Sequence, residues 1–181
     1  MNKSRFRLAA FSAMAVLAAG CAGYSWKNSV PEDMRTVSVP VFRNETHVTG
    51  LGNAVTRQIL REFQRGGTFK IVAVGDAAVE VQGVLENTST KAIAFERSTG
   101  DRYRERRLEV KAVISIVDKK LGKVIVDNRE YKASTTYLDD GDMLTRQREA
   151  SGRIGEDIAR QVVDDVVSIF SKKGEEAENG R

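Results

Sequence analysis

The chain has 181 residues, of which 41% are hydrophobic, and its formal net charge is +4. Three of the cations, Lys3, Arg5 and Arg7, precede Cys21 and no acidic residue does, so from Cys21 onward the net charge is 4 − 3 = +1. This near-neutral balance argues against a nucleic-acid partner. Cys21 is the only cysteine, so no intramolecular disulfide forms, and the 181 − 20 = 161 residues from Cys21 onward suit one domain.

The first twenty residues have the parts of a secretory signal: basic residues, an uncharged run from Leu8 to Ala19, and small residues at its end. As a helix the run would span about 18 Å, well short of the ~30 Å hydrocarbon core of a bilayer. The sequence Ala18-Ala19-Gly20-Cys21 resembles a bacterial lipobox, although the branched aliphatic residue, Leu17, stands one place early. We expect residues 1–20 to be a lipoprotein signal peptide and Cys21 to carry a covalent lipid. The alternative is an ordinary signal peptide that leaves a free thiol.

Residues 21–35 are small and polar around Pro31, which is typical of a tether that leads into a domain. Thr36–Phe42 alternates valines with other residues and predicts a strand. Pro40 has no N–H to donate to a ladder, so we expect an edge strand, or a Pro40 whose nitrogen faces outward. The only histidine, His47, follows in a predicted turn without other metal ligands at suitable spacing.

Leu51–Arg65 has apolar residues at the helical period and predicts an amphipathic helix that Gly66 and Gly67 end. Two strands are predicted next, at 69–72 and 79–85. The glycines at 50 and 52 do not make a nucleotide-binding loop, because Val55 occupies the place of the third glycine.

Tyr103–Val117 alternates over a long strand, and its predicted core face consists of Leu108, Val110, Ala112, Ile114 and Ile116. Arg102, Arg104 and Arg106 continue the same parity towards the N-terminal end, so we expect three clustered guanidinium groups that could bind phosphate oxygens or an acidic groove of a partner protein. The alternative is a solvated strand end balanced by Asp101, Glu105 and Glu109. A turn at 118–122 and a partner strand at 123–136 complete a predicted hairpin.

A helix is predicted from about Leu144 to Phe170, with Asp142 as its N-cap and an apolar stripe at every fourth residue. Residues 172–181 are polar and charged, and we expect a disordered tail. The domain at 36–171 is therefore predicted to be α+β: a single mixed sheet of four or five strands, with two helices packed on one face, in the order βαββββα.

Catalytic patterns are missing from the sequence. A hydrolase triad needs a base, and His47 stands alone, with no GxSxG, no HExxH and no cysteine pair for zinc. We expect a protein that is not an enzyme and that holds no metal and no cofactor apart from the lipid on Cys21.

Several segments taken together resemble one known family. These segments are the run 36–46 before a helix, the run 76–83, Tyr103-Arg104-Glu105-Arg106 at the start of a long strand, Gly122-Lys123-Val124 at the hairpin, and 133–137 before the last helix. Their order and spacing are similar to those of the LptE-type lipopolysaccharide-assembly lipoproteins of the outer membrane. The resemblance covers about residues 21–170.

The resemblance implies a lipid-anchored protein on the periplasmic side of the outer membrane. Such a protein plugs a β-barrel lipopolysaccharide translocon, helps it to assemble and contacts lipopolysaccharide. Ala22, directly after the cysteine, is similar to the residue found in lipoproteins that are sent to the outer membrane. The first strand and helix also resemble envelope lipoproteins that activate a peptidoglycan synthase or form part of a secretion channel, and this alternative stays open. A purely structural envelope lipoprotein is a third possibility.

Overall fold

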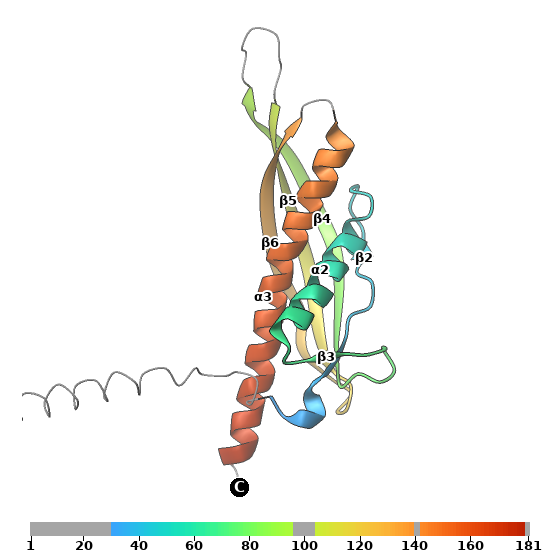
Figure 1. Ribbon diagram of the computed structural model, residues 1–181, viewed down its shortest axis with the longest axis vertical. Helices are drawn as coiled ribbons and strands as arrows, with labels where there is room; N and C mark the ends of the chain where they lie inside the picture. The colour runs from blue at the N-terminus through green and yellow to red at the C-terminus, as the bar shows by residue number, and fades with distance from the viewer. Residues whose placement is uncertain (1–29, 96–103, 140–141, 180–181) are drawn as a thin grey trace, which may run out of the picture.

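The computed structural model of the chain describes residues 30–95, 104–139 and 142–179 (Figure 1). A 3₁₀ helix, η3 (Glu32–Met34), leads into β1 (Thr36–Ser38) and β2 (Arg43–Asn44), and α2 (Leu51–Gly66) follows. The chain continues through β3 (Lys70–Ile71) and three long strands, β4 (Val79–Phe95), β5 (Arg104–Asp118) and β6 (Lys123–Asp139). It closes with the long helix α3 (Met143–Asn179).

The strands form one mixed sheet in the order β3-β1-β4-β5-β6, with β2 paired to β4 beyond β1. β1 is parallel to both of its neighbours, whereas β4, β5 and β6 form an antiparallel meander. Both helices lie on the same side of this sheet (Figure 1). The predicted α+β class and the two helices on one face are confirmed, and the described sheet has six strands where four or five were expected.

The hydrophobic core fills the space between the sheet and the helices. The predicted face of β5, from Leu108 to Ile116, is buried, and so is the stripe of α3 that includes Ile158. Valine and isoleucine dominate that stripe against their intrinsic helix propensity, so burial against the sheet holds the helix in place. The opposite face of the meander is covered by neither helix.

The helix boundaries follow from local hydrogen bonds. The carboxylate of Asp142 accepts a hydrogen bond from the backbone N–H of Thr145 at 3.3 Å, as an N-cap does. Gly67 has a positive φ of 63° and its N–H donates to the carbonyl of Phe63, which ends α2 as predicted.

The structure corrects three expected boundaries. β1 ends at Ser38 and lies between β3 and β4, so it is not an edge strand and Pro40 stands outside it. The third predicted strand continues past residue 85 to Phe95, because a bulge between Leu85 and Asn87 interrupts the alternation that marked it. The tail expected from residue 172 is instead helical as far as Asn179.

Side chains of α3 lie along the free edge of β6. Arg153 donates to the carbonyl of Thr136 at 2.9 Å, and Gln161 donates to the carbonyl of Lys132 at 3.4 Å. Further along the edge, Asp165 accepts hydrogen bonds from Arg129 at 2.7 Å and from the hydroxyl of Tyr131 at 2.6 Å. Helix and edge strand are thus joined by polar contacts as well as by the core.

Two ends of the domain can be distinguished in Figure 1. At the first end, which we call the base, lie the β5–β6 turn, η3 and the C-terminal end of α3. Lys120 of the turn contacts Asp33 of η3 at 2.9 Å, and Lys173 of α3 contacts Asp118 at 2.7 Å. At the other end, which we call the tip, β4 ends, β5 begins, and β6 passes into α3.

Candidate functional site

The face of β4, β5 and β6 that points away from the helices carries many charged side chains, and we call it the open face. Period-two geometry brings outward side chains of the three strands into rows. Glu109 of β5 lies in register between Ser89 of β4 and Ser134 of β6, and Lys111 lies in register with Lys132. The rows therefore alternate between acidic and basic centres along the sheet.

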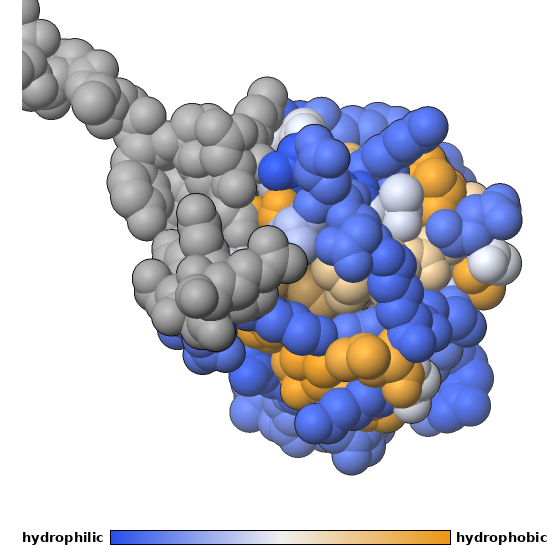
Figure 2. Space-filling model, turned by 90° about the horizontal axis from the view of Figure 1, so that it is seen from below, coloured by the Kyte–Doolittle hydropathy of each residue, from blue (hydrophilic) through white to orange (hydrophobic). Residues whose placement is uncertain are grey.

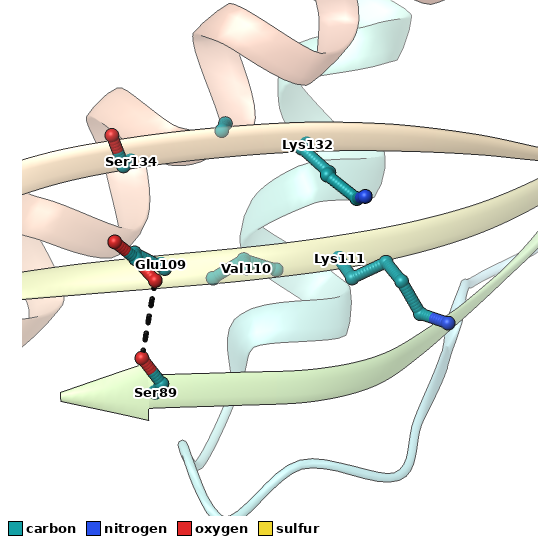
Figure 3. Close-up of a pocket in the computed structure, with 7 residues that line it drawn as sticks. Ser89, Glu109, Val110, Lys111, Lys132 and Ser134 are labelled. Atoms are coloured by element: carbon teal, nitrogen blue, oxygen red, sulfur yellow. Dashed lines mark hydrogen bonds between the residues drawn. The ribbon is translucent and has the colours of Figure 1, made fainter.

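A shallow hollow of about 490 Å³ lies on this face. Its walls are formed by Ser89, Glu109, Val110, Lys111, Lys132, Ala133 and Ser134. Figure 3 shows Glu109 directed towards Ser89, whose hydroxyl donates to the carboxylate at 3.2 Å, while the chains of Lys111 and Lys132 extend along the strands. The hollow is thus open and lined mostly by polar and charged residues, unlike the enclosed pockets that hold small cofactors.

The charges of the open face compensate one another. Lys111 contacts Glu86 at 2.9 Å and Glu130 at 3.3 Å, and Lys132 also contacts Glu130, at 3.5 Å. Hydrogen bonds to Glu86 and Glu130 raise the pKa of Lys111, and the hydrogen bond from Lys111 lowers the pKa of Glu130. Among the described residues, the carboxylates balance the lysines, so the hollow has no excess of cations that would attract an anion.

Of the three arginines singled out in the sequence, Arg104 and Arg106 lie at the tip. Arg102 lies outside the described residues, and Arg104 begins β5. Arg106 is half-buried, and its Nε contacts a carboxylate oxygen of Asp139 at 2.8 Å. In the described part of the chain its ion-pair partner is therefore a residue of β6 and neither Glu105 nor Glu109, and Asp101 lies outside the described residues.

Apolar side chains are also exposed at this end of the domain. Leu138 precedes Asp139, the last residue of β6, and lies on the opposite face of that strand, while Met143 and Leu144 begin α3. The tip thus combines the Arg106–Asp139 ion pair with exposed hydrophobic side chains.

Sequence reasoning missed the basic and acidic pattern of the open face. Glu130, Lys132, Ser134 and Thr136 alternate along β6, so period two could have placed them on one face. Their partners on β5 could not be deduced, because two register shifts between Ile114 and Val117 move the pairing by two residues.

The sequence also singled out its only cysteine and its only histidine. Cys21, with the signal and tether before residue 30, lies outside the described residues. His47 lies in a turn, where Nδ1 is 3.0 Å from the hydroxyl oxygen of Thr88. Among the residues that the structure describes, no three His, Cys, Asp or Glu side chains gather as metal ligands would, and no helix is both long and apolar enough to span a bilayer.

Comparison with known proteins gives one family match. The model of the LptE family, described as lipopolysaccharide-assembly, matches residues 34–168. No curated protein matches the sequence.

Two solved structures with TM-scores above 0.5 show the same fold at low identity, and a third is similar. A putative neuraminyllactose-binding hemagglutinin homolog from Helicobacter pylori is 9% identical with a TM-score of 0.51, over 83% of this chain and 92% of that one. A protein from Xanthomonas campestris is 10% identical with a TM-score of 0.51, over 80% and 92%. An uncharacterized lipoprotein B from Nitrosomonas europaea is 14% identical with a TM-score of 0.49, over 82% and 90%.

Proposed function

Since the chain belongs to the LptE lipopolysaccharide-assembly family, we propose that it is an outer-membrane lipoprotein that plugs the β-barrel lipopolysaccharide translocon. Membership gives the chain a role in lipopolysaccharide assembly. The proposal adds that Cys21 carries the lipid anchor on the periplasmic side, that the domain stands within the barrel and helps it to assemble, and that the tip contacts lipopolysaccharide.

The open face is the observation that supports the plug. The interior of a large outer-membrane barrel is polar, so a plug must present polar side chains to its wall. Charges that lose water need partners, because an unpaired charge is costly to desolvate. Lys111, Glu130 and Lys132 already have ion-pair partners within the domain. A barrel wall can therefore cover the face without leaving these charges desolvated and unpaired.

A charge-reversal variant tests the plug. The changes Lys111→Glu and Lys132→Glu would leave Glu86 and Glu130 facing new carboxylates on the open face. We expect the barrel to be lost from the detergent pull-down of this double variant, as identified by mass spectrometry. The matched control is Arg57→Glu with Arg61→Glu, which places the same charge change on exposed positions of α2.

The result separates the plug from its alternatives. Equal recovery of the barrel with both double variants, in folded proteins, would contradict the plug. A peptidoglycan synthase or a ring of identical subunits in place of the barrel would instead favour the other envelope roles.

The proposed contact with lipopolysaccharide involves Arg102, Arg104 and Arg106. Arginine binds phosphate oxygens in a bidentate manner, and lipopolysaccharide joins phosphates to acyl chains. Asp139 holds Arg106 at the tip, and Leu138 and Leu144 expose apolar surface at the same end of the domain.

This contact is tested by changing all three arginines to glutamine and measuring lipopolysaccharide binding and barrel binding separately. Loss of lipopolysaccharide binding alone is expected. Unchanged binding of both, with normal folding, would refute the contact.

A further inference from the structure

We propose that the base of the domain rests on the surface of the anionic bilayer and inserts the β5–β6 turn, through Leu121, into its headgroup region. The proposal rests on the acylation of Cys21 proposed above. It adds a second membrane contact, made by folded protein.

The turn presents an apolar side chain outward. Leu121 is 66% exposed and Val124, which follows the turn, is 48% exposed. In Figure 2, which looks onto the base, hydrophobic residues are exposed as patches within a mostly hydrophilic surface. A leucine at the end of a hairpin gains little from this position in water, whereas the interface of a bilayer would bury it.

The turn is also held rigidly. The carboxylate of Asp118 accepts hydrogen bonds from the backbone N–H groups of Lys120 and Leu121, both at 3.0 Å. It also forms an ion pair with Lys173 of α3. Burial raises the pKa of Asp118, but the hydrogen bonds from Lys173 and from the backbone outweigh it and hold the pKa below its ordinary value. Because Asp118 stays ionised, Leu121 projects from a fixed support, and insertion would order few further residues.

Lysines surround this apolar side chain. Lys119 pairs with Glu80 at 3.4 Å and Lys120 with Asp33 at 2.9 Å, whereas no carboxylate in the described part of the chain pairs with Lys123. A cation beside an exposed leucine suits a surface of anionic lipid headgroups. The contact of Lys120 with Asp33 can also be exchanged for a lipid phosphate, since the two side chains are 45% and 66% exposed.

The length of the tether places the base near the bilayer. Val30 lies 30 − 21 = 9 residues after Cys21, which spans at most about 30 Å when fully extended. Asp33, three residues later, touches the β5–β6 turn through Lys120, so the turn lies at the end of the domain where the tether begins. A lipid anchor on Cys21 would hold the turn at a high effective concentration near the membrane, where even a small apolar contact forms.

The test uses the acylated full-length chain with a thiol placed at each end of the domain. Acylation consumes Cys21, so Leu121→Cys carries the only free thiol, to which an environment-sensitive NBD fluorophore is attached. The matched control is Leu144→Cys at the tip, where the native leucine is 74% exposed. Both proteins are reconstituted into vesicles of phosphatidylethanolamine and phosphatidylglycerol that contain nitroxide-labelled lipids.

We expect both proteins to float with the vesicles and lipid quenching to be at least about twofold stronger at position 121 than at position 144. Flotation with equal quenching at the two positions would overturn the membrane contact while leaving the anchor intact. Failure to float would remove the anchor and the contact together. If lipid quenching at position 121 is weak, and the fluorophore enters an apolar environment only when the barrel is added, the turn contacts a protein partner. This result would also overturn the proposal.

Discussion

The two faces of the β4–β5–β6 meander come from the same strands but meet different surroundings. On the helix-covered face, Leu108 to Ile116 pack against α2 and α3 in the buried core. On the open face, lysines and glutamates of neighbouring strands form exposed ion pairs. Burial of apolar surface contributes far more to stability than exposed ion pairs do, so the covered face determines the fold and leaves the open face free to serve a partner.

The largest expected effect follows from disturbing the covered face at Ile158. This side chain of α3 is fully buried. Ile158→Ala should lower the free energy of unfolding by about 2–5 kcal/mol through lost contacts and a cavity, and Ile158→Asp should prevent folding. Urea denaturation followed by circular dichroism measures both. A folded Ile158→Asp protein with an unchanged melting transition would show that the stripe does not form the core.

A glycine of β4 gives a smaller effect on the same face. A Cβ at Gly83 would overlap the ring of Phe42, which is itself buried. Gly83→Ala should therefore cost about 1–3 kcal/mol of unfolding free energy, through overpacking. Gly75→Ala, where the added Cβ meets no neighbouring atom within 4 Å, is the control. Equal thermal stability of the two variants would contradict the close packing of Phe42 on the sheet.

The ion pair between the buried carboxylate of Asp118 and the partly exposed Lys173 should give an intermediate effect. The pKa of Asp118 is below its ordinary value of 3.8, so its ionised form stabilises the folded state above that pH. The stabilisation is lost as the pH falls through the folded-state pKa. Asp118→Asn should cost about 1–3 kcal/mol at pH 7, and the difference from the unchanged protein should shrink below about pH 4. Urea midpoints across this range measure it, and a pH-independent difference would disprove the charge effect.

The smallest expected effect comes from the open face. Lys111→Gln removes two ion pairs whose groups are partly exposed, so the melting temperature should stay nearly unchanged. The same variant should weaken recovery of the barrel if the open face is the contact. A large loss of thermal stability would show that the open face supports the fold and would remove the contrast between the two faces.

The covered face could be predicted from the sequence because apolar residues repeat at period two in β5 and at every fourth residue in α3. The polar segments that extend β4 and α3 beyond their apolar patterns were harder to predict. Thr88, Ser89 and Thr90 extend β4 beyond its bulge without hydrophobic alternation, and the end of α3 after Phe170 has lost its apolar stripe. Both segments hold their structure through neighbours that a single sequence does not reveal.

The ion pair at the tip could not be predicted either, because it depends on the register of the β5–β6 hairpin. Arg106 and Asp139 are 33 residues apart, and their meeting depends on the two register shifts in the β5–β6 hairpin. Asn128, with a positive φ of 47°, lies in the shifted stretch of β6. A hairpin counted from its turn without these shifts would pair Arg106 with Thr135, so Asp139 would have seemed too far along the strand.

The side chains of α3 that contact the edge of β6 affect how prone the unbound chain is to aggregate. An exposed edge of 17 residues is a template on which other strands can add, and such addition leads to aggregates. Arg153 and Gln161 occupy the carbonyls of Thr136 and Lys132 that an incoming strand would need. The helix therefore protects the edge of β6 from pairing with a strand of another molecule. A chain that lacks either side chain should self-associate more readily in the unbound state.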